Sequence, residues 1–146
     1  MVPAVEDSEL VIRSGAVADL PAILEFWVEA AEGTDRRDDP NKVVALIERD
    51  PEALLIAEIG GRMVGTLIAG WDGWRAHLYR LAVAVEFRRR GIGGALIEAA
   101  EERFSGFAAF RVDAMVLHDN ELAHHAWQAA GYRRQAQWGR WVKPLV

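Results

Sequence analysis

Apolar residues follow helical spacing in four stretches of the chain. From Leu20 onward, the i, i+3, i+4, i+7 rule predicts an amphipathic helix whose buried stripe would consist of Leu20, Ile23, Leu24, Trp27, Val28 and Ala31. Asp39 followed by Pro40 suits an N-cap and first helical position, and predicts a second helix that buries Val43, Val44 and Ile47. Further helices are expected over residues 93–104 and over residues 121–130, the latter ending at Gly131.

Strand-like stretches separate these helices. They cover residues 10–13, 54–59, 63–69, 76–85, 111–117 and 132–142. Gly60 and Gly61 mark a hairpin turn, and residues 71–74 mark another, so three consecutive strands should form an antiparallel meander. The element order β-α-α-β-β-β-α-β-α-β predicts an α/β (α+β) fold with a mixed sheet and about four helices.

Length and composition restrict the class of protein. A chain of 146 residues with 51% hydrophobic composition suits a single domain over residues 1–146, with a core from about residue 10 to residue 145. The formal charge of −5 argues against a nucleic-acid partner, and the lack of cysteine excludes disulfides and a cysteine nucleophile. The first seven residues lack a signal-peptide pattern and no apolar run could span a membrane, so we expect a cytoplasmic protein without a membrane partner.

A loop rich in arginine and glycine connects the strand that ends near residue 85 to the third helix. Its residues are Arg88, Arg89, Arg90, Gly91, Ile92, Gly93 and Gly94. A helix N-terminus presents unpaired N–H groups and partial positive charge, so this loop could hold phosphate, with coenzyme A as a fitting ligand. The alternative is a solvated turn that the glycines only shape. The P-loop and dinucleotide-binding fingerprints are both absent.

Two motifs resemble those of the GNAT (GCN5-related N-acetyltransferase) superfamily. Residues 88–93 match the family's [RQ]-x-x-G-x-[GA] loop, and a second family motif is matched in register by Asn120, Ala123, Ala126, Trp127, Gly131 and Tyr132. The element order agrees with the family over nearly the whole chain. The resemblance implies a GNAT fold, with about six or seven strands and a splayed fourth strand, and acetyl-CoA as co-substrate.

The resemblance also implies a cofactor site. The residues expected to contact acetyl-CoA are Leu81, Ala82 and Val83 on the fourth strand, the loop from Arg88 to Gly94, and Asn120, Ala123 and Trp127. A bulge that frees an N–H group is expected near residues 82–85. Trp127 stands where the family usually has a tyrosine that protonates the leaving thiolate, and an indole cannot supply that proton.

His77 is the first candidate for the general base, since it begins the fourth strand, where histone-type relatives place a catalytic glutamate. Tyr79 should lie on the same face and could line the site or relay protons. An equally good interpretation is a strand histidine with no task. No metal site is expected, because His118, His124 and His125 lack carboxylate partners at a recognised spacing.

The implied reaction is direct attack of a primary amine on acetyl-CoA in a ternary complex, with a small-molecule amine as acceptor. An acidic segment could attract a cationic amine or could simply be a solvated loop; it holds Glu29, Glu32, Asp35, Asp38 and Asp39. Alternatives are acetylation of protein N-termini or lysines, and a non-catalytic acyl-CoA-binding module. Trp138 and Trp141 near the end also make a homodimer through the last strand plausible.

Overall fold

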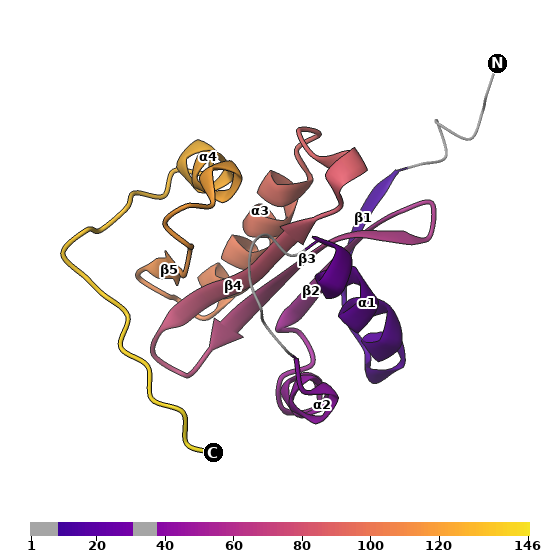
Figure 1. The fold of residues 1–146 in the computed structure, drawn as a ribbon, viewed down its shortest axis with the longest axis horizontal. Helices are drawn as coiled ribbons and strands as arrows, with labels where there is room; N and C mark the ends of the chain where they lie inside the picture. The colour runs from indigo at the N-terminus through magenta and orange to yellow at the C-terminus, as the bar shows by residue number, and fades with distance from the viewer. Residues whose placement is uncertain (1–8, 31–37) are drawn as a thin grey trace.

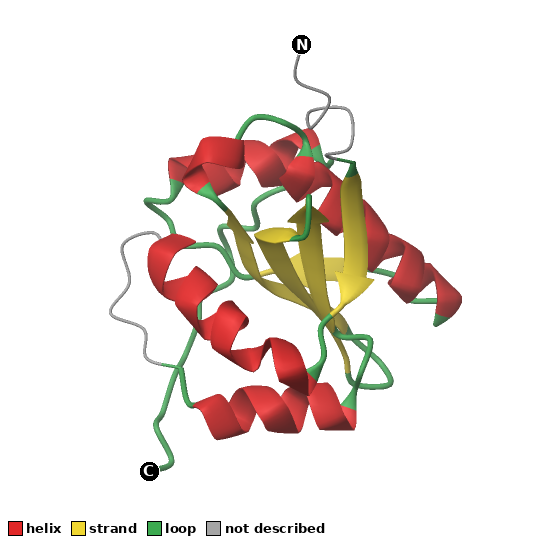
Figure 2. Cartoon of the chain, turned by 90° about the vertical axis from the view of Figure 1, so that its right-hand side faces the viewer, coloured by secondary structure: helices red, strands yellow, loops and turns green. Residues whose placement is uncertain are grey.

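A mixed sheet with helices on both faces forms the body of the protein (Figures 1 and 2). The computed structural model describes residues 9–30 and 38–146. The strands found there are β1 (Leu10–Ser14), β2 (Leu54–Ile59), β3 (Arg62–Trp71), β4 (Ala76–Val83) and β5 (Val112–Ala114). The helices are α1 (Leu20–Ala30), α2 (Pro40–Arg49), α3 (Ile92–Gly106) and α4 (Glu121–Ala129), with short 3₁₀ turns at Val17–Asp19 and Val85–Phe87. Across these described ranges, no helix is long and apolar enough to cross a membrane.

The strand order in the sheet is β1-β2-β3-β4-β5. The first four strands pair antiparallel, whereas β5 runs parallel to β4 because α3 crosses over between them. Gly60 and Gly61 form the two-residue turn between β2 and β3, and both have the positive φ that favours glycine. The predicted meander and the α/β fold class are therefore confirmed.

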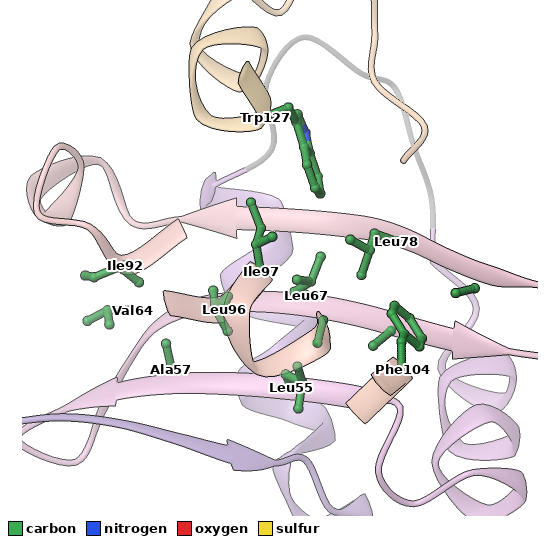
Figure 3. Packing of buried hydrophobic residues seen from close by; sticks show 13 residues of the cluster. Leu55, Ala57, Val64, Leu67, Leu78, Ile92, Leu96, Ile97, Phe104 and Trp127 are labelled. Atoms are coloured by element: carbon green, nitrogen blue, oxygen red, sulfur yellow. The ribbon is translucent and has the colours of Figure 1, made fainter. Parts of the chain in front are cut away.

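Each face of the sheet carries its own apolar core. On the α3 face, buried residues include Leu55, Leu67, Leu78, Leu96, Phe104 and Trp127 (Figure 3). On the opposite face, α1 and α2 cover a second cluster that includes Ile23, Trp27, Val43, Ile47, Leu54, Ile56 and Ile68. The predicted stripe of α1 is wrong at Val28, which is 81% exposed, because the helix turns Phe26 and Ala30 inward instead. Ala31 lies outside the described residues.

The predicted strand over residues 132–142 is wrong, so the described sheet has five strands and not six or seven. Residues 133–146 are exposed and form no helix or strand. The apolar alternation that predicted a strand is weak here, because polar residues fill positions 133–135 and Gly139 interrupts the tryptophans. The strand predicted over residues 111–117 shortens to β5, since only Val112–Ala114 pairs with β4.

The N-cap prediction for α2 is confirmed. Asp39 accepts a hydrogen bond from the Asn41 amide at 2.9 Å, and Pro40 occupies the first turn. Val43 and Ile47 are buried, as predicted. Asp38, the residue before this N-cap, lies beside β4 and forms an ion pair with Arg80.

Arg13 on β1 forms ion pairs with two carboxylates. These ion pairs predict how the free energy of unfolding depends on pH. Its guanidinium donates to both Asp19 oxygens at 2.8 Å and to Glu58 at 2.9 Å. The hydrogen bonds from Arg13 lower the pKa of Asp19 from 3.8 to about 2. Because the folded-state pKa lies below the unfolded value, the stabilisation is complete above about pH 4 and is lost as the pH falls through about 2.

Acid titration of the free energy of unfolding tests this ion pair. Between about pH 5 and about pH 2, wild-type protein should lose about 1 kcal/mol more stability than Asp19→Asn, a modest difference because Arg13 is partly solvated. The asparagine keeps the shape of the side chain without its charge. Parallel pH profiles for the two proteins would contradict a stabilising role for the Arg13 contact.

Candidate active site

β4 is distorted by a bulge at Arg80 and Leu81. Thr66 pairs with Ala82 and Ile68 pairs with Tyr79, so Arg80 and Leu81 together face the single residue between those two on β3. Arg80 has a φ of 60°, a left-handed conformation that costs a non-glycine residue roughly 1–2 kcal/mol. The sequence predicted a bulge near residues 82–85, and the structure places it slightly earlier, at Arg80 and Leu81.

A buried chain of hydrogen bonds holds the bulge in place. The Trp27 indole N–H on α1 donates to the Thr66 hydroxyl at 2.9 Å, and that hydroxyl donates to the Arg80 carbonyl at 3.0 Å. The Arg80 guanidinium lies 4.7 Å from the centre of the Trp27 ring and forms an ion pair with Asp38. The bulge is therefore tied both to α1 and to the segment that enters α2.

Replacing Thr66 with Val or Ser tests this arrangement. Thr66→Val keeps the shape but removes the hydroxyl, leaving the Trp27 N–H without its acceptor in a site with 0% exposure. We expect it to lower the free energy of unfolding by about 1–3 kcal/mol, measured by denaturant titration. Thr66→Ser keeps the hydroxyl and should cost less. Equal losses for the two variants would mean that packing, not hydrogen bonding, holds the bulge.

Beyond its first three residues, β4 separates from β5. Only Ala76, His77 and Leu78 pair with β5, whereas Ala82 and Val83 pair with β3 alone among the described strands. Leu81 and Val83 turn toward the α3 core. The separation leaves one backbone edge of β4 next to the bulge able to accept an extended ligand as an added strand would pair.

This edge leads directly to the start of α3. Gly91 is the N-cap of α3 with a φ of 79°, and a Cβ at Gly91 or Gly94 would meet no atom within 4 Å. Ile92 anchors the turn, because its side chain is only 2% exposed in the core. The side-chain positions of Gly91 and Gly94 therefore face free space at a positive helix end, and such a helix start can bind phosphate through its first N–H groups.

The three arginines of the loop have different surroundings. Arg88 is half-buried, and its Nε donates to the Val83 carbonyl at 3.1 Å, which links the loop to the end of β4. Arg89 and Arg90 are exposed, and the Arg90 guanidinium lies 5.1 Å from the centre of the Phe87 ring. Arg88 thus shapes the loop, while Arg89 and Arg90 are placed to meet an anion in solvent.

Asn120 and Ala123 begin α4 as a structural pair. The Asn120 side chain is the N-cap and accepts a hydrogen bond from the Ala123 amide at 3.1 Å. This bond accounts for the motif spacing without a ligand. Their predicted contact with acetyl-CoA stays a prediction.

Trp127 lies in the core. It is 6% exposed and points from α4 toward Ile97 and Leu78 (Figure 3). Its ring meets Tyr132 edge-on at 5.0 Å, and the Tyr132 hydroxyl donates to Glu101 at 2.8 Å. Burial and this carboxylate raise the pKa of Tyr132. The geometry favours packing over the catalytic or cofactor-binding role that the motif position suggested for Trp127.

Substitution of Trp127 separates packing from chemistry. Trp127→Ala should lower the free energy of unfolding by about 3–5 kcal/mol, measured by denaturant titration, because it empties a large buried site. Trp127→Phe fills most of that site and should stay folded and active. If Trp127→Phe is folded but its rate of acetyl transfer is more than about 100-fold below that of wild type, Trp127 has a catalytic role.

His77 forms a pair with Asp113 on the neighbouring strand. Its Nδ1 lies 2.7 Å from an Asp113 carboxylate oxygen, and its Nε2 lies 3.9 Å from Asp72. The side chain of His77 is 40% exposed, so Nε2 remains accessible to solvent. A carboxylate on Nδ1 fixes the imidazole tautomer that leaves Nε2 free to accept a proton.

Tyr79 lies on the same face of β4 as His77. Its ring packs over Gly70, where a Cβ would lie 3.3 Å from Cε1. Burial, followed by the charge of Asp50, raises the pKa of the Tyr79 hydroxyl. Tyr79 therefore keeps its proton at neutral pH and lies between His77 and the bulge at Arg80.

The remaining polar candidates do not gather at this site. His118 contacts Arg134, and His124 contacts the Leu117 carbonyl. Within the described residues, no group of three or more potential ligands could hold a metal ion. In the acidic segment, Asp38 forms an ion pair with Arg80 and Asp39 caps α2. Glu29 is exposed, and Glu32 and Asp35 lie outside the described residues.

Two shallow grooves lie elsewhere, between β1 and α3. Their volumes are about 390 and 490 Å³, and both are lined by Ser14, Leu55 and Glu102. Neither groove includes a residue of β4 or of the arginine-glycine loop. The candidate site consequently rests on the bulge, the separated strand edge and the start of α3.

Comparison with known proteins agrees with this geometry. The model of the acetyltransferase (GNAT) family matches residues 20–132. The chain belongs to the GNAT acetyltransferase family. A protein named acetyltransferase from Pectobacterium atrosepticum is 31% identical over 103 residues, which cover 70% of this chain and 73% of the relative.

Solved structures share the fold. The Salmonella typhimurium protein yncA, determined with its cofactor acetyl-CoA, has a TM-score of 0.72 at 20% identity, covering 87% of this chain and 81% of the other. Aminoglycoside N-acetyltransferase AAC(6')-Iy, in complex with CoA, has a TM-score of 0.75 at 19% identity, covering 98% and 99%. At this identity the likeness shows the common GNAT fold.

Proposed function

We propose that this GNAT protein transfers an acetyl group from acetyl-CoA to a primary amine of a small molecule. The observation that carries the proposal is the continuous path from the bulge of β4, along its separated edge, to the left-handed Gly91 at the start of α3. Structural relatives include two that were determined with acetyl-CoA or CoA. Their ligands support acetyl-CoA as the donor that would lie along this path.

Two parts of the path would hold the donor. The amides at the start of α3, with Arg89 and Arg90 beside them, would bind the pyrophosphate. The backbone edge at Leu81–Val83 would pair with the pantetheine arm without needing particular side chains. When bound, acetyl-CoA supplies an acetyl group activated as a thioester.

The bulge supplies a hydrogen-bond donor near the reacting carbonyl. An extra residue in a bulge lies outside the regular ladder of backbone hydrogen bonds. Arg80 is one of the two residues of the bulge, and we assign its amide as the donor to the developing oxyanion. Trp27 and Asp38 keep this amide in place through their contacts with Arg80.

His77 accepts the proton of the attacking amine, and Asp113 orients its ring. A strand advances about 3.3 Å per residue, so His77 lies roughly 10 Å before the bulge. The protonated Tyr79 hydroxyl spans part of that distance and can pass a proton to His77 as it receives one. The chain has no cysteine, so a cysteine acyl-enzyme cannot form. This is consistent with direct attack of the amine on the thioester in a ternary complex.

A comparison of acceptors tests the small-molecule assignment. Thiol release from acetyl-CoA would be measured with polyamines, aminoglycosides and amino acids, and in parallel with peptides that carry a free N-terminus or a lysine. We expect kcat/KM to be highest for a small amine. A peptide preference would support the protein-acetyltransferase alternative, and binding of acetyl-CoA without turnover on any acceptor would support the non-catalytic one.

A further inference from the structure

Gly70 is a glycine inside the apolar strand β3, one residue before the strand ends at Trp71. A glycine in a strand has no side chain to pack and loses more conformational freedom on folding than other residues, so it often marks a close approach of other atoms. The backbone itself does not require a glycine here, because Gly70 is not among the residues with a positive φ. The reason for this residue therefore lies in what packs against it.

Gly70 shares one face of the sheet with His77 and Tyr79. On the neighbouring strands β3 and β4 (Figure 1), Gly70 pairs with His77. Tyr79 pairs with Ile68, so Tyr79 is the diagonal neighbour of Gly70. Ile68 belongs to the core beneath α1 and α2, whereas Leu78 belongs to the core on the α3 face. Alternation along the strands thus places His77, Tyr79 and Gly70 on the face of α1 and α2.

The Tyr79 ring fills the space that a side chain at residue 70 would occupy. A Cβ on Gly70 would lie 3.3 Å from Cε1 of Tyr79 and 3.5 Å from its hydroxyl oxygen. Carbon atoms in favourable contact are about 3.5–4.0 Å apart, so the ring could not keep this place above any other residue. The hydroxyl consequently lies over the residue directly opposite His77, in a pair whose side chains would start about 4.5–5.5 Å apart.

The His77 imidazole has its second nitrogen toward β3. Nδ1 contacts Asp113 on β5, which lies on one side of β4. Nε2 lies 3.9 Å from Asp72, the residue that follows β3 on the other side. Nε2 of His77 and the hydroxyl of Tyr79 are therefore both directed toward the same strand.

We propose that Gly70 is a positioning residue for proton transfer, because its missing side chain lets the Tyr79 ring lie over β3 with the hydroxyl on the Nε2 side of His77. This inference rests on the proposed function. The Tyr79 O–H bond breaks as its proton moves to Nε2, and the same oxygen takes a proton from the attacking amine. The amine nitrogen bonds to the acetyl carbon, the C–S bond breaks, and the thiolate leaves while His77 holds the proton.

Steady-state kinetics of Gly70→Ala and Tyr79→Phe, alone and combined, test this role with acetyl-CoA and the small amine that wild type acetylates fastest. The added methyl group displaces the ring, so Gly70→Ala should lower kcat about 10-fold or more and leave the KM for acetyl-CoA within a few-fold of wild type. In the Tyr79→Phe background there is no hydroxyl to displace, and the same change should lower kcat less than about two-fold. Losses that multiply in the double variant would overturn the positioning role.

Gly106→Ala is the matched control, because a Cβ on this residue at the end of α3 would meet no atom within 4 Å. Its kcat should equal that of wild type. Circular dichroism and thermal melting establish that each variant is folded.

A second pair of substitutions applies even if Gly70→Ala does not fold. Tyr79→Phe and His77→Gln are compared singly and together. Since one proton passes through both groups, the double variant should be within about two-fold of the slower single variant. Independent, multiplying losses would mean that the Tyr79 hydroxyl does not serve His77, and the role of Gly70 would be overturned.

The activity of wild type separates this inference from the proposed function. Thiol release that does not depend on an amine would contradict the proposed function, and the positioning role would be overturned with it. If wild type acetylates amines and folded Gly70→Ala has the same kcat, the proposed function stands and only the role of Gly70 is overturned.

Discussion

Gly91→Glu is expected to abolish acetyl-CoA binding, with the dissociation constant rising at least about 100-fold in a calorimetric titration. The residue caps α3 with a φ of 79°, and its Cβ position faces open space. A glutamate there places negative charge at the helix end that is proposed to receive the pyrophosphate. It also removes the glycine that allows this backbone conformation.

Gly73→Glu is the control for this substitution. Gly73 has a φ of 96°, lies in open space and belongs to the turn at the other end of β4. The same residue change at the same kind of backbone position should therefore leave acetyl-CoA affinity within a few-fold of wild type. If both variants bind as wild type does, the pyrophosphate is not held at the start of α3.

His77→Gln should lower kcat by about 100- to 10,000-fold and leave the affinity for acetyl-CoA unchanged, because the histidine acts on the amine and not on the donor. Asp113→Asn should lower kcat less, by about 10-fold or more, since an amide can still contact Nδ1 but no longer fixes the tautomer reliably. Steady-state kinetics and calorimetry on the same preparations separate the two quantities.

His125→Gln supplies the comparison for these variants. His125 is an exposed histidine on α4 and is not part of the His77–Asp113 pair. The His125→Gln variant should have the same kcat as the wild type. A His77→Gln enzyme with undiminished kcat would show that His77 is a strand histidine without a catalytic task, which is the other interpretation that its sequence position allowed.

Local sequence signals predicted the parts of the site that lie along one stretch of chain. Gly91 and its neighbours follow a strand and open a helix, so the phosphate loop could be predicted from residue types and spacing alone. The hairpin at Gly60 and Gly61 and the cap at Asp39 were predictable for the same reason. Each depends on backbone preferences within about four residues.

Contacts between distant segments could not be predicted in this way. Thr66 is 39 residues from Trp27 and 14 from Arg80, and no periodic pattern links these residues. The partnership of His77 with Asp113 depends on the parallel register of β4 and β5, which the strand patterns alone do not fix. The signal available in the sequence was a polar residue inside an apolar strand, as at Thr66 in β3 and Arg80 in β4.

At the end of the chain, the sequence pattern predicted a strand that the described structure does not contain. The prediction rested on the sequence pattern of residues 132–142, yet a strand needs a partner as well as a pattern. The described structure of one copy leaves residues 133–146 unpaired.

The most direct measurement is acetyl-CoA consumption with and without a panel of small primary amines, with the product identified by mass spectrometry. We expect thiol release that depends on the amine and yields an N-acetylated product in equal amount. Thiol release that is the same without any amine, with no acetylated product at any acceptor concentration, would contradict acetyl transfer to an amine by this protein.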